Sequence, residues 1–448
     1  MKPTKETLDA LEKSVSYSSL NINKITQIRD WVIDLNAKLH SKLTLIKLSE
    51  SNYWYYDTSK SIILNKNQSF FSIQGIQGTV NKSSVNQPII VQNEVGYLGI
   101  ITKIFNGCLY FLMQAKIEPG NINKIQISPT IQATKSNFTQ KHGGKKPLFL
   151  EYFQNVDDYE VLYDGEQSEQ CSRFYKKYNR NVIIKIEKDF SIGPRFCWMT
   201  VSEVNYLMVN FANLVNMDTR TVLSCLPQSQ NMSFENEDSS KAMLYYNYLK
   251  ESQNRSAIHQ NLCPLSSLSN WLVSDSEIRC RTKFPFLIKF FDIEIEDREV
   301  SKWTQPLVVA DGMALFGTFV RYGKDDLEIL IKIKEEIGCE NGSLYGPLVQ
   351  KESTDKIDES ILIQKCFKKQ LDTNEGVLVD TILSEEGGRF YQEQNRNVII
   401  FANSNAIKTV LPSGYFWVKK SILSELIRYY KVVNIQLRNL YSLLKEKI

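Results

Sequence analysis

An internal repeat constrains the fold of this chain more than any other feature of its sequence. Residues 86–99, NQPIIVQNEVGYLG, align without gaps with residues 304–317, TQPLVVADGMALFG, at a displacement of 218 residues. The same displacement relates FLMQAKIEPG at 111–120 to ILIKIKEEIG at 329–338. A repeat of this length, kept in register over separate segments, indicates two copies of one structural unit.

The strongest match joins SEQCSRFY at 168–175 to SEEGGRFY at 384–391, followed by NRNVII at 179–184 and again at 395–400. Two further matches keep the same order: Trp198 with Trp417, and VNMDTR at 215–220 with VNIQLR at 433–438. This order extends over more than a hundred residues. We therefore infer a duplication.

The segment between the copies predicts where they divide. Residues 228–240, QSQNMSFENEDSS, are polar and rich in turn-forming residues, which is typical of an exposed linker. We predict an N-terminal module over 1–227, a linker over 228–258 and a C-terminal module over 259–448. We also expect each copy to begin with a tryptophan-bearing helix, over 25–33 and over 265–273.

Hydrophobic patterning within each copy predicts an α+β fold. LEILIKIK at 327–334 alternates apolar and charged residues, and NVIIKI at 181–186 is a β-branched run, so both segments are predicted strands. Residues 199–209 and 418–427 have the apolar spacing of a helix. Strands followed by a late helix favour a mixed α/β sandwich in each copy and do not favour an alternating βαβ series.

Composition excludes several classes of function. The 54 basic and 50 acidic side chains nearly balance, and no basic block marks a nucleic-acid-binding surface. The opening segment, MKPTKETLDALEKS, lacks the apolar core of a signal peptide, and no apolar run approaches about 20 residues, so we expect a cytoplasmic protein that does not enter a membrane. Eight cysteines without a CxxC pair and three dispersed histidines argue against a metal site and favour free thiols.

No Walker loop, GxGxxG or HExxH motif is present. Gly317 and the segment KEEIG at 334–338 imitate the two ends of a Nudix box, the magnesium-binding helix of diphosphate hydrolases. Gly323, Ile331 and Lys332 occupy the interior positions where that box carries its glutamates and its arginine. A metal-dependent pyrophosphate hydrolase would therefore lack its ligands.

The doubled motif SExxxRFY carries chemically useful groups. If the segment is extended, alternation places Glu169, Arg173 and Tyr175 on one face, and their counterparts Glu385, Arg389 and Tyr391 likewise. Such a face offers an acid, a base and a phosphate-binding group together. The alternative is a surface salt bridge beside a packed aromatic ring.

A second candidate segment occurs only in the first copy, as SPTIQATKSNFTQKHGGK at 128–145. It combines hydroxyl groups, an amide, cations, His142 and a Gly-Gly pair, a composition typical of a loop that closes over an anionic ligand. The alternative is an ordinary solvated basic loop. The second copy keeps only Pro347 and Gln350 of this segment, so the two copies differ where a ligand would be held.

Four motifs resemble the NDP-hexose 2,3-dehydratase family: SPTIQATKSNFTQKHGG at 128–144, EQSEQCSRFYKKYNRN at 166–181, VNMDTRTVLSCLP at 215–227 and SEEGGRFYQEQNRN at 384–397. The resemblance covers nearly the whole chain. It implies a cofactor-independent lyase that acts on dTDP-4-keto-6-deoxy-D-glucose. It further implies two Nudix-like modules per subunit, assembly as a homodimer, and two nucleotide-sugar pockets of which one is catalytic.

The chemistry of such a lyase suggests roles for side chains. A base removes the C3 proton, which the neighbouring C4 carbonyl acidifies, and an acid protonates the departing C2 hydroxyl. Our acid/base candidates are Glu169, His142 and Tyr175 in the first pocket, with Glu385 and Tyr391 as the rival set. Our substrate-binding candidates are Gln132, Thr134, Lys135, Asn137, Arg173, Asn179, Arg180, Arg220, Arg389 and Arg396, with Trp303 or Tyr97 stacking on thymine and with no metal or cofactor.

The sequence departs from the family pattern at two positions, and two alternative functions remain open. Leu348 stands where the family usually has threonine, and Cys171 replaces a usual glycine. The first departure weakens the case for a working second pocket. A Nudix-type hydrolase would release a nucleoside monophosphate with magnesium, and a non-catalytic module would bind a nucleotide sugar without turnover.

Overall fold

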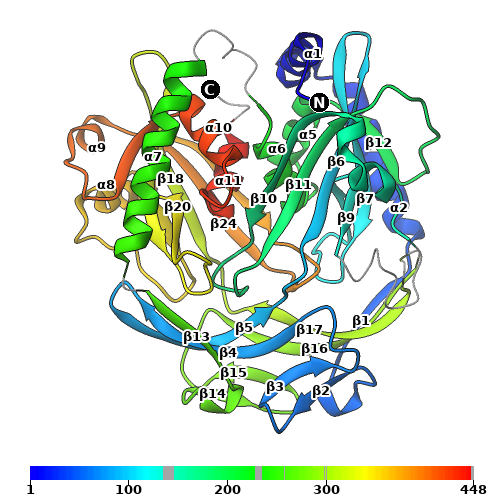
Figure 1. The fold of residues 1–448 in the computed structure, drawn as a ribbon, viewed down its shortest axis with the longest axis vertical. Coiled ribbons are helices and arrows are strands. Elements are labelled where there is room, and N and C mark those ends of the chain that lie inside the picture. Colours follow the sequence, from blue (N-terminus) through cyan, green and yellow to red (C-terminus); the bar gives the residue numbers. More distant parts are fainter. Residues whose placement is uncertain (135–145, 228–234, 257, 297, 299, 445–448) are drawn as a thin grey trace.

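The computed structural model describes residues 1–134, 146–227, 235–256, 258–296, 298 and 300–444. Two lobes lie side by side above a pair of twisted sheets (Figure 1). Each lobe is built around one seven-stranded sheet, and the two sheets below mix strands from both copies. The expected mixed α/β architecture with a twofold repeat is confirmed.

The first lobe belongs to the first copy. Its strands follow the order β10-β11-β6-β7-β12, with β8 beside β7 and β9 beside β6. They are β6 (Gly96–Phe105), β7 (Cys108–Ile117), β8 (Ile125–Ser128), β9 (Ile131–Ala133), β10 (Glu160–Ser168), β11 (Tyr178–Lys185) and β12 (Phe196–Met199). Its helices are α1 (Lys5–Val15), α2 (Ile22–Lys38), α4 (Leu150–Gln154), α5 (Val201–Asn210) and α6 (Met217–Ser224).

The second lobe repeats this arrangement with the second copy. The strand order is β20-β19-β18-β24-β22, with β21 beside β18 and β25 beside β19. The strands are β18 (Leu315–Tyr322), β19 (Leu327–Glu335), β20 (Ser343–Pro347), β21 (Val349–Lys351), β22 (Val377–Ser384), β24 (Gln394–Phe401) and β25 (Tyr415–Lys419). The helices are α7 (Glu235–Arg255), α8 (Leu362–Asp372), α9 (Ser404–Lys408), α10 (Lys420–Arg428) and α11 (Ile435–Leu443).

The sheets below the lobes exchange one strand between the copies. One contains β1 (Ser41–Ile46), β14 (Trp271–Val273), β15 (Glu277–Cys280), β16 (Phe286–Ile295), β17 (Lys302–Ala310) and β23 (Phe390–Tyr391). The other contains β2 (Trp54–Asp57), β3 (Ile62–Asn65), β4 (Ser72–Val80), β5 (Ser83–Val91) and β13 (His259–Cys263). First-copy β1 pairs with second-copy β16, and β13 pairs with β4 in return. Each copy therefore completes a sheet of the other.

Tryptophan side chains reinforce this exchange. The Trp54 indole donates its N–H to the backbone oxygen of Thr304 at 2.7 Å, and the Trp271 indole donates to that of Asn86 at 2.9 Å. Both indoles are buried, and a buried N–H requires a partner. The two bonds are equivalent under the repeat, so they hold the copies together in the same way from both sides.

Two glycines let the copies approach closely. A Cβ atom on Gly120 would lie 1.6 Å from the backbone oxygen of Phe390, and one on Gly338 would lie 2.1 Å from that of Cys171. The Gln392 N–H donates to the oxygen of Gly120 and the Lys176 N–H to that of Gly338, both at 2.7 Å. Only glycine permits such contacts. Each SExxxRFY loop is thereby fixed against the other copy.

The main hydrophobic core spans both lobes. Helices α6 and α11 pack against each other between the lobe sheets (Figure 1), and Leu223 and Leu437 are buried there. Arg220 from α6 donates to the backbone oxygen of Ser384 at 2.7 Å, and Arg438 from α11 donates to that of Ser168 at 2.6 Å. These buried arginines tie each helix to the other copy's SExxxRFY loop.

Most predicted elements are confirmed. The strands expected at 327–334 and 181–186 are β19 and β11, and the late helices are α5 and α10. The helix expected at 25–33 lies within α2.

The helix expected at 265–273 is wrong. That segment forms a 3-10 turn, Leu265–Ser267, followed by strand β14. Leu265, Leu268 and Trp271 have helical spacing, but all three are buried in a hydrophobic cluster formed by residues of both lower sheets. The intervening serines and asparagine favour turns. Trp271 is therefore the counterpart of Trp54 and not of Trp31.

The connection between the copies contains a long helix. Residues 228–234 lie outside the described residues, and α7 covers Glu235–Arg255 along the second lobe (Figure 1). The polar segment predicted as a linker is thus helical from residue 235 onward. Among the described residues, no helix is both long and apolar enough to cross a membrane.

Candidate active site

A cavity of about 460 Å³ opens between the first lobe and the sheets below it. The first copy contributes residues from β2, β6, β9, the β10–β11 loop and the start of α6. The second copy contributes residues of β17 and of the loop before β23. The volume lies within the range typical of sites for small ligands. Because both copies supply the walls, neither copy forms this cavity alone.

Four carboxyl groups line the cavity: Glu118, Glu169, Asp218 and Glu386. Burial disfavours ionisation of Glu118, but Arg298 and Lys116 outweigh that effect and lower its pKa to about 2. Their nitrogen atoms lie 3.0 and 2.9 Å from its carboxylate. Glu118 is therefore a permanent anion at neutral pH.

Two of the other carboxyl groups have raised pKa values. Burial raises the pKa of Asp218 well above its usual range, and the nearby charges of Glu386 and Glu169 add to this. Burial raises the pKa of Glu386 to about 7, although Arg389 opposes it. Carboxyl groups whose pKa values are driven apart within one site are typical of acid/base chemistry.

Glu169 is held by two neighbours in the loop between β10 and β11. Asn179 donates its side-chain N–H to the carboxylate at 2.7 Å, and the Lys177 ammonium donates to the Asn179 amide oxygen at 2.8 Å. Burial lowers the pKa of Lys177 to about 8, so this side chain remains mostly a cation at neutral pH. The arrangement fixes a carboxylate beside a positive donor at the cavity wall.

Cations and aromatic rings occupy another part of the wall. The Arg389 guanidinium lies 4.2 Å from the ring centre of Phe70, and one of its nitrogens donates to the Gln92 side chain at 3.2 Å. Arg298 lies 5.7 Å from the ring centre of Trp303. Arginine beside aromatic rings suits a ligand with a diphosphate and a planar base.

The structure brings six predicted substrate-binding or catalytic residues to this cavity: Gln132, Thr134, Glu169, Asn179, Trp303 and Arg389. Tyr97, the alternative stacking residue, also lines it. Lys135, Asn137 and His142 lie outside the described residues, so their predicted roles stay predictions.

The expectation that Glu169 and Arg173 share one face is wrong. Residues 171–173 form a turn between β10 and β11, so strand alternation does not apply to them. Glu169 lines the cavity, whereas Arg173 reaches the equivalent region of the second copy and pairs there with Glu352. Arg389 of the second copy takes the complementary place beside Glu169. The duplicated loops thus exchange their arginines.

Other candidates lie away from the cavity. Tyr175 packs against a small apolar cluster, and Tyr391 stacks on Phe291 with ring centres 4.8 Å apart. Arg180 and Arg396 form two-pronged ion pairs with Asp164 and Asp380, with nitrogen–oxygen distances of 2.6–2.8 Å. Arg220, at 1% exposure, is bound to backbone oxygens. These predicted roles at the ligand conflict with the positions of the side chains.

Sequence reasoning missed six charged cavity residues that the site description uses: Lys116, Glu118, Lys177, Asp218, Arg298 and Glu386. Lys116 and Glu118 belong to the repeated segment 111–120, whose second-copy counterpart drew attention only as a degraded Nudix box. Asp218 and Glu386 lie in the motifs VNMDTR and SEEGGRFY, at positions where the other copy carries glutamine. This difference between the copies could have identified Asp218 and Glu386 as candidate site residues.

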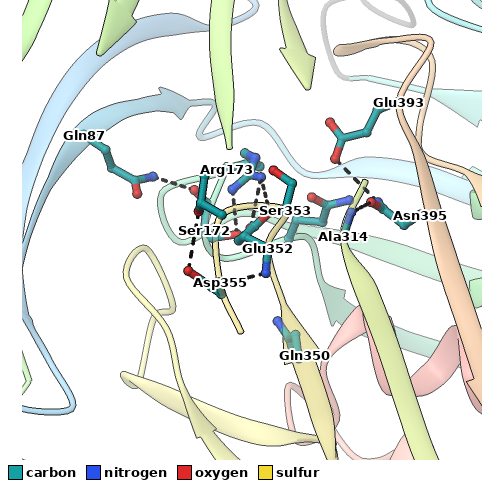
Figure 2. Close-up of polar contacts among 12 residues, drawn as sticks. Gln87, Ser172, Arg173, Ala314, Gln350, Glu352, Ser353, Asp355, Glu393 and Asn395 are labelled. Carbon is teal, nitrogen blue, oxygen red and sulfur yellow. Dashed lines mark hydrogen bonds and ion pairs between the residues drawn. The ribbon is translucent and has the colours of Figure 1, made fainter. Parts of the chain in front are cut away.

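In the equivalent region of the second copy, side chains from both copies bind one another. Glu352 stands where the first copy has Thr134, and its carboxylate accepts a hydrogen bond from Arg173 at 3.0 Å (Figure 2). Gln350 donates to Glu336 at 2.8 Å, and Asn395 donates to Glu385 at 2.6 Å. We call this region, around Arg173, Glu352 and Glu385, the second site.

Comparison with known proteins shows the family to which the chain belongs. The family model for NDP-hexose 2,3-dehydratases matches residues 25–226 and again residues 243–444. A relative from Saccharopolyspora spinosa, dTDP-4-dehydro-6-deoxy-alpha-D-glucopyranose 2,3-dehydratase, is 33% identical over 93% of this chain and 90% of its own length. Relatives of the same name from Amycolatopsis orientalis and Streptomyces violaceoruber are each 31% identical, over 93% and 92% of this chain and 89% and 95% of their own lengths. The chain therefore belongs to the NDP-hexose 2,3-dehydratase family of enzymes, with one family unit in each copy of its repeat.

Proposed function

We propose that this enzyme removes the C2 hydroxyl of dTDP-4-keto-6-deoxy-D-glucose and yields the 3,4-diketo-2,6-dideoxy sugar nucleotide. The observation that carries the proposal is the two-copy cavity, where Glu169 lies beside a cation and near carboxyl groups whose pKa values burial raises. The substrate named for the three relatives has the ketone that this chemistry requires.

Glu169 is the proposed base for the C3 proton. The C4 carbonyl acidifies that proton because the resulting charge spreads onto the carbonyl oxygen as an enolate. Lys177 and Asn179, which position Glu169, supply donors for this oxygen. Loss of the C2 hydroxyl then leaves an enol that becomes the C3 ketone. Carbon C2 is reduced and C3 is oxidised within one molecule, so the reaction consumes no redox cofactor.

Substrate binding is assigned to the cation-rich and aromatic wall. Arg389 and Arg298 suit the diphosphate, and Trp303 or Tyr97 suits the thymine ring. Gln132 and Thr134 line the cavity, and they suit the sugar hydroxyls because an amide and a hydroxyl group can each donate and accept hydrogen bonds. The second site is assigned no turnover, since Glu352 occupies its arginine.

We also propose that the chain consists of Nudix-like modules over 1–227 and 259–448, joined by a linker over 228–258, and that it forms a cytoplasmic homodimer. The family resemblance supports this assembly, and the repeated lobe sheets are compatible with two related modules.

The test is to incubate the purified protein with dTDP-4-keto-6-deoxy-D-glucose and follow loss of water by mass spectrometry and loss of the C2 oxygen by NMR. We expect the diketo product, with equal rates in the presence and absence of EDTA. Failure to lose water would overturn the proposed reaction, and inhibition by EDTA would overturn its metal independence. Release of dTMP with magnesium would support a Nudix hydrolase, and tight binding without turnover would support a binding module.

A further inference from the structure

The two sites differ at the positions where a proton can be transferred. Asp218 and Glu386 line the cavity. In the alignment of the two copies, Asp218 corresponds to Gln436 and Glu386 corresponds to Gln170. A glutamine donates a hydrogen bond as a protonated carboxyl group does, but it has no proton to release. The second site therefore has no titrating side chain at these two positions.

The position of Glu386 at the cavity suits a catalytic role. It lies in the loop between β22 and β23 and lines the cavity. One carboxyl oxygen accepts the Gly388 backbone N–H at 2.7 Å. Its counterpart Gln170 instead donates a hydrogen bond to the Glu385 carboxylate in the second site. Glu386, by contrast, is half-buried and lines the cavity.

We propose that Glu386, supplied by the second copy, is the catalytic acid that protonates the departing C2 hydroxyl in the first-copy cavity. This inference rests on the proposed function. It makes the active site composite, with the base Glu169 from one copy and the acid from the other. The duplication would thus be required for catalysis and not only for folding.

The step balances in protons and electrons. Glu169 takes the C3 proton, and the electrons of the C3–H bond form the C2–C3 double bond. The C2–O bond breaks, and its oxygen leaves as water with the proton of Glu386. As the enol becomes the ketone, its hydroxyl proton returns to Glu386 and the proton on Glu169 goes to C2. Both carboxyl groups end as they began.

Neighbouring charges agree with this role. The titratable and charged groups that act on Glu386 or respond to it are Glu118, Glu169, Lys177, Asp218 and Arg389. Burial raises the pKa of Glu386 to about 7, and the anion Glu118 contributes to this. The side chain is therefore largely protonated below pH 7 and loses its proton above it. A general acid works best with a pKa near the working pH.

The first experiment compares wild type with Glu386→Gln. We expect the variant to lose at least about 100-fold in kcat, the lower range for general acid catalysis, while the Kd for dTDP changes less than about twofold. In D₂O the variant should still exchange the C3 hydrogen of the substrate, because Glu169 remains, whereas Glu169→Gln should not. Retained turnover, or loss of both exchange and turnover with dTDP still bound, would overturn the role.

Glu393→Gln is the matched control. Glu393 is buried in the second site, and burial raises its pKa to about 8, so the same substitution again replaces a buried protonated carboxyl group. We expect its kcat to stay within about twofold of wild type. A loss as large as that of Glu386→Gln would show a general effect of such substitutions and overturn the assignment.

A second measurement needs no variant. The wild-type kcat should fall as pH rises through about 7, because Glu386 then loses the proton that it must donate. A kcat that stays constant up to pH 8, where Lys177 begins to titrate, would overturn the proposal. If wild type itself fails to dehydrate the substrate, the proposed function fails first, and that result is distinct from an active wild type with an active Glu386→Gln variant.

Discussion

The cavity and the second site began as the same site and now differ in what fills them. Both keep a glutamate held by an asparagine, Glu169 with Asn179 and Glu385 with Asn395, at 2.7 and 2.6 Å. In both sites the arginine contributed by the other copy lies against an aromatic ring, Arg389 over Phe70 and Arg173 over Phe286, but in the second site the arginine is also paired with Glu352. One difference directly after a short strand, Glu352 in place of Thr134, thus places a carboxylate beside the arginine of the second site. The comparison teaches that a conserved motif identifies a pair of sites, while its neighbours decide which site is open.

The largest expected contrast comes from the paired glutamates. Glu169→Gln should lower kcat by about 100-fold or more, because the base for the C3 proton is removed. Glu385→Gln should change kcat by less than about twofold, since its site is closed. Steady-state rates with the keto sugar measure both. Equal losses would break the distinction between the sites.

The paired arginines should separate binding from stability. Arg389→Ala should raise the Kd for dTDP about tenfold or more, because a diphosphate contact is lost. Arg173→Ala should leave that Kd unchanged and instead lower the free energy of unfolding by about 1–3 kcal/mol, since Glu352 loses its partner. Calorimetric titration and urea denaturation measure the two effects. A reversed pattern would place the ligand in the second site.

A buried acid in the second site should make stability depend on pH. Burial raises the pKa of Glu393 to about 8 in the folded state, so the folded chain keeps a proton that the unfolded chain releases at lower pH. The free energy of unfolding should therefore fall as pH rises toward 8, by about 1 kcal/mol per pH unit. Glu393→Gln should flatten this slope in urea titrations at pH 6 and 7.5. An unchanged slope would assign it to other groups.

The smallest expected effect tests whether the second site can be reopened. Glu352→Thr restores the residue that the first copy has at position 134 and releases Arg173. We expect a second, weaker dTDP-binding event in calorimetry, with the rate of dehydration unchanged. Binding of one dTDP per chain in both proteins would show that other differences, such as Glu393 opposite Lys177, also close the site.

Sequence reasoning predicted the repeat, the lobe strands, the late helices and several cavity residues, because these depend on local patterns. It failed at Arg173 because an eight-residue motif was treated as a strand, although its middle forms a turn. It failed at Trp271 because three buried apolar residues at helical spacing also suit a turn and a strand. It passed over Asp218 and Glu386 because attention went to identities between the copies and not to their differences.

The sequence by itself determined that this chain is built twice and that both copies carry the same acid, amide and arginine. It also contained four motifs that resemble one family, and the model of that family matches each copy. Only the tertiary structure decided which residues meet. The exchanged strands β1 and β13 and the close contacts at Gly120 and Gly338 send each arginine into the other copy's site. Such contacts join residues between 167 positions apart (Cys171 and Gly338) and 270 positions apart (Gly120 and Phe390), and no local pattern records a pairing over such distances.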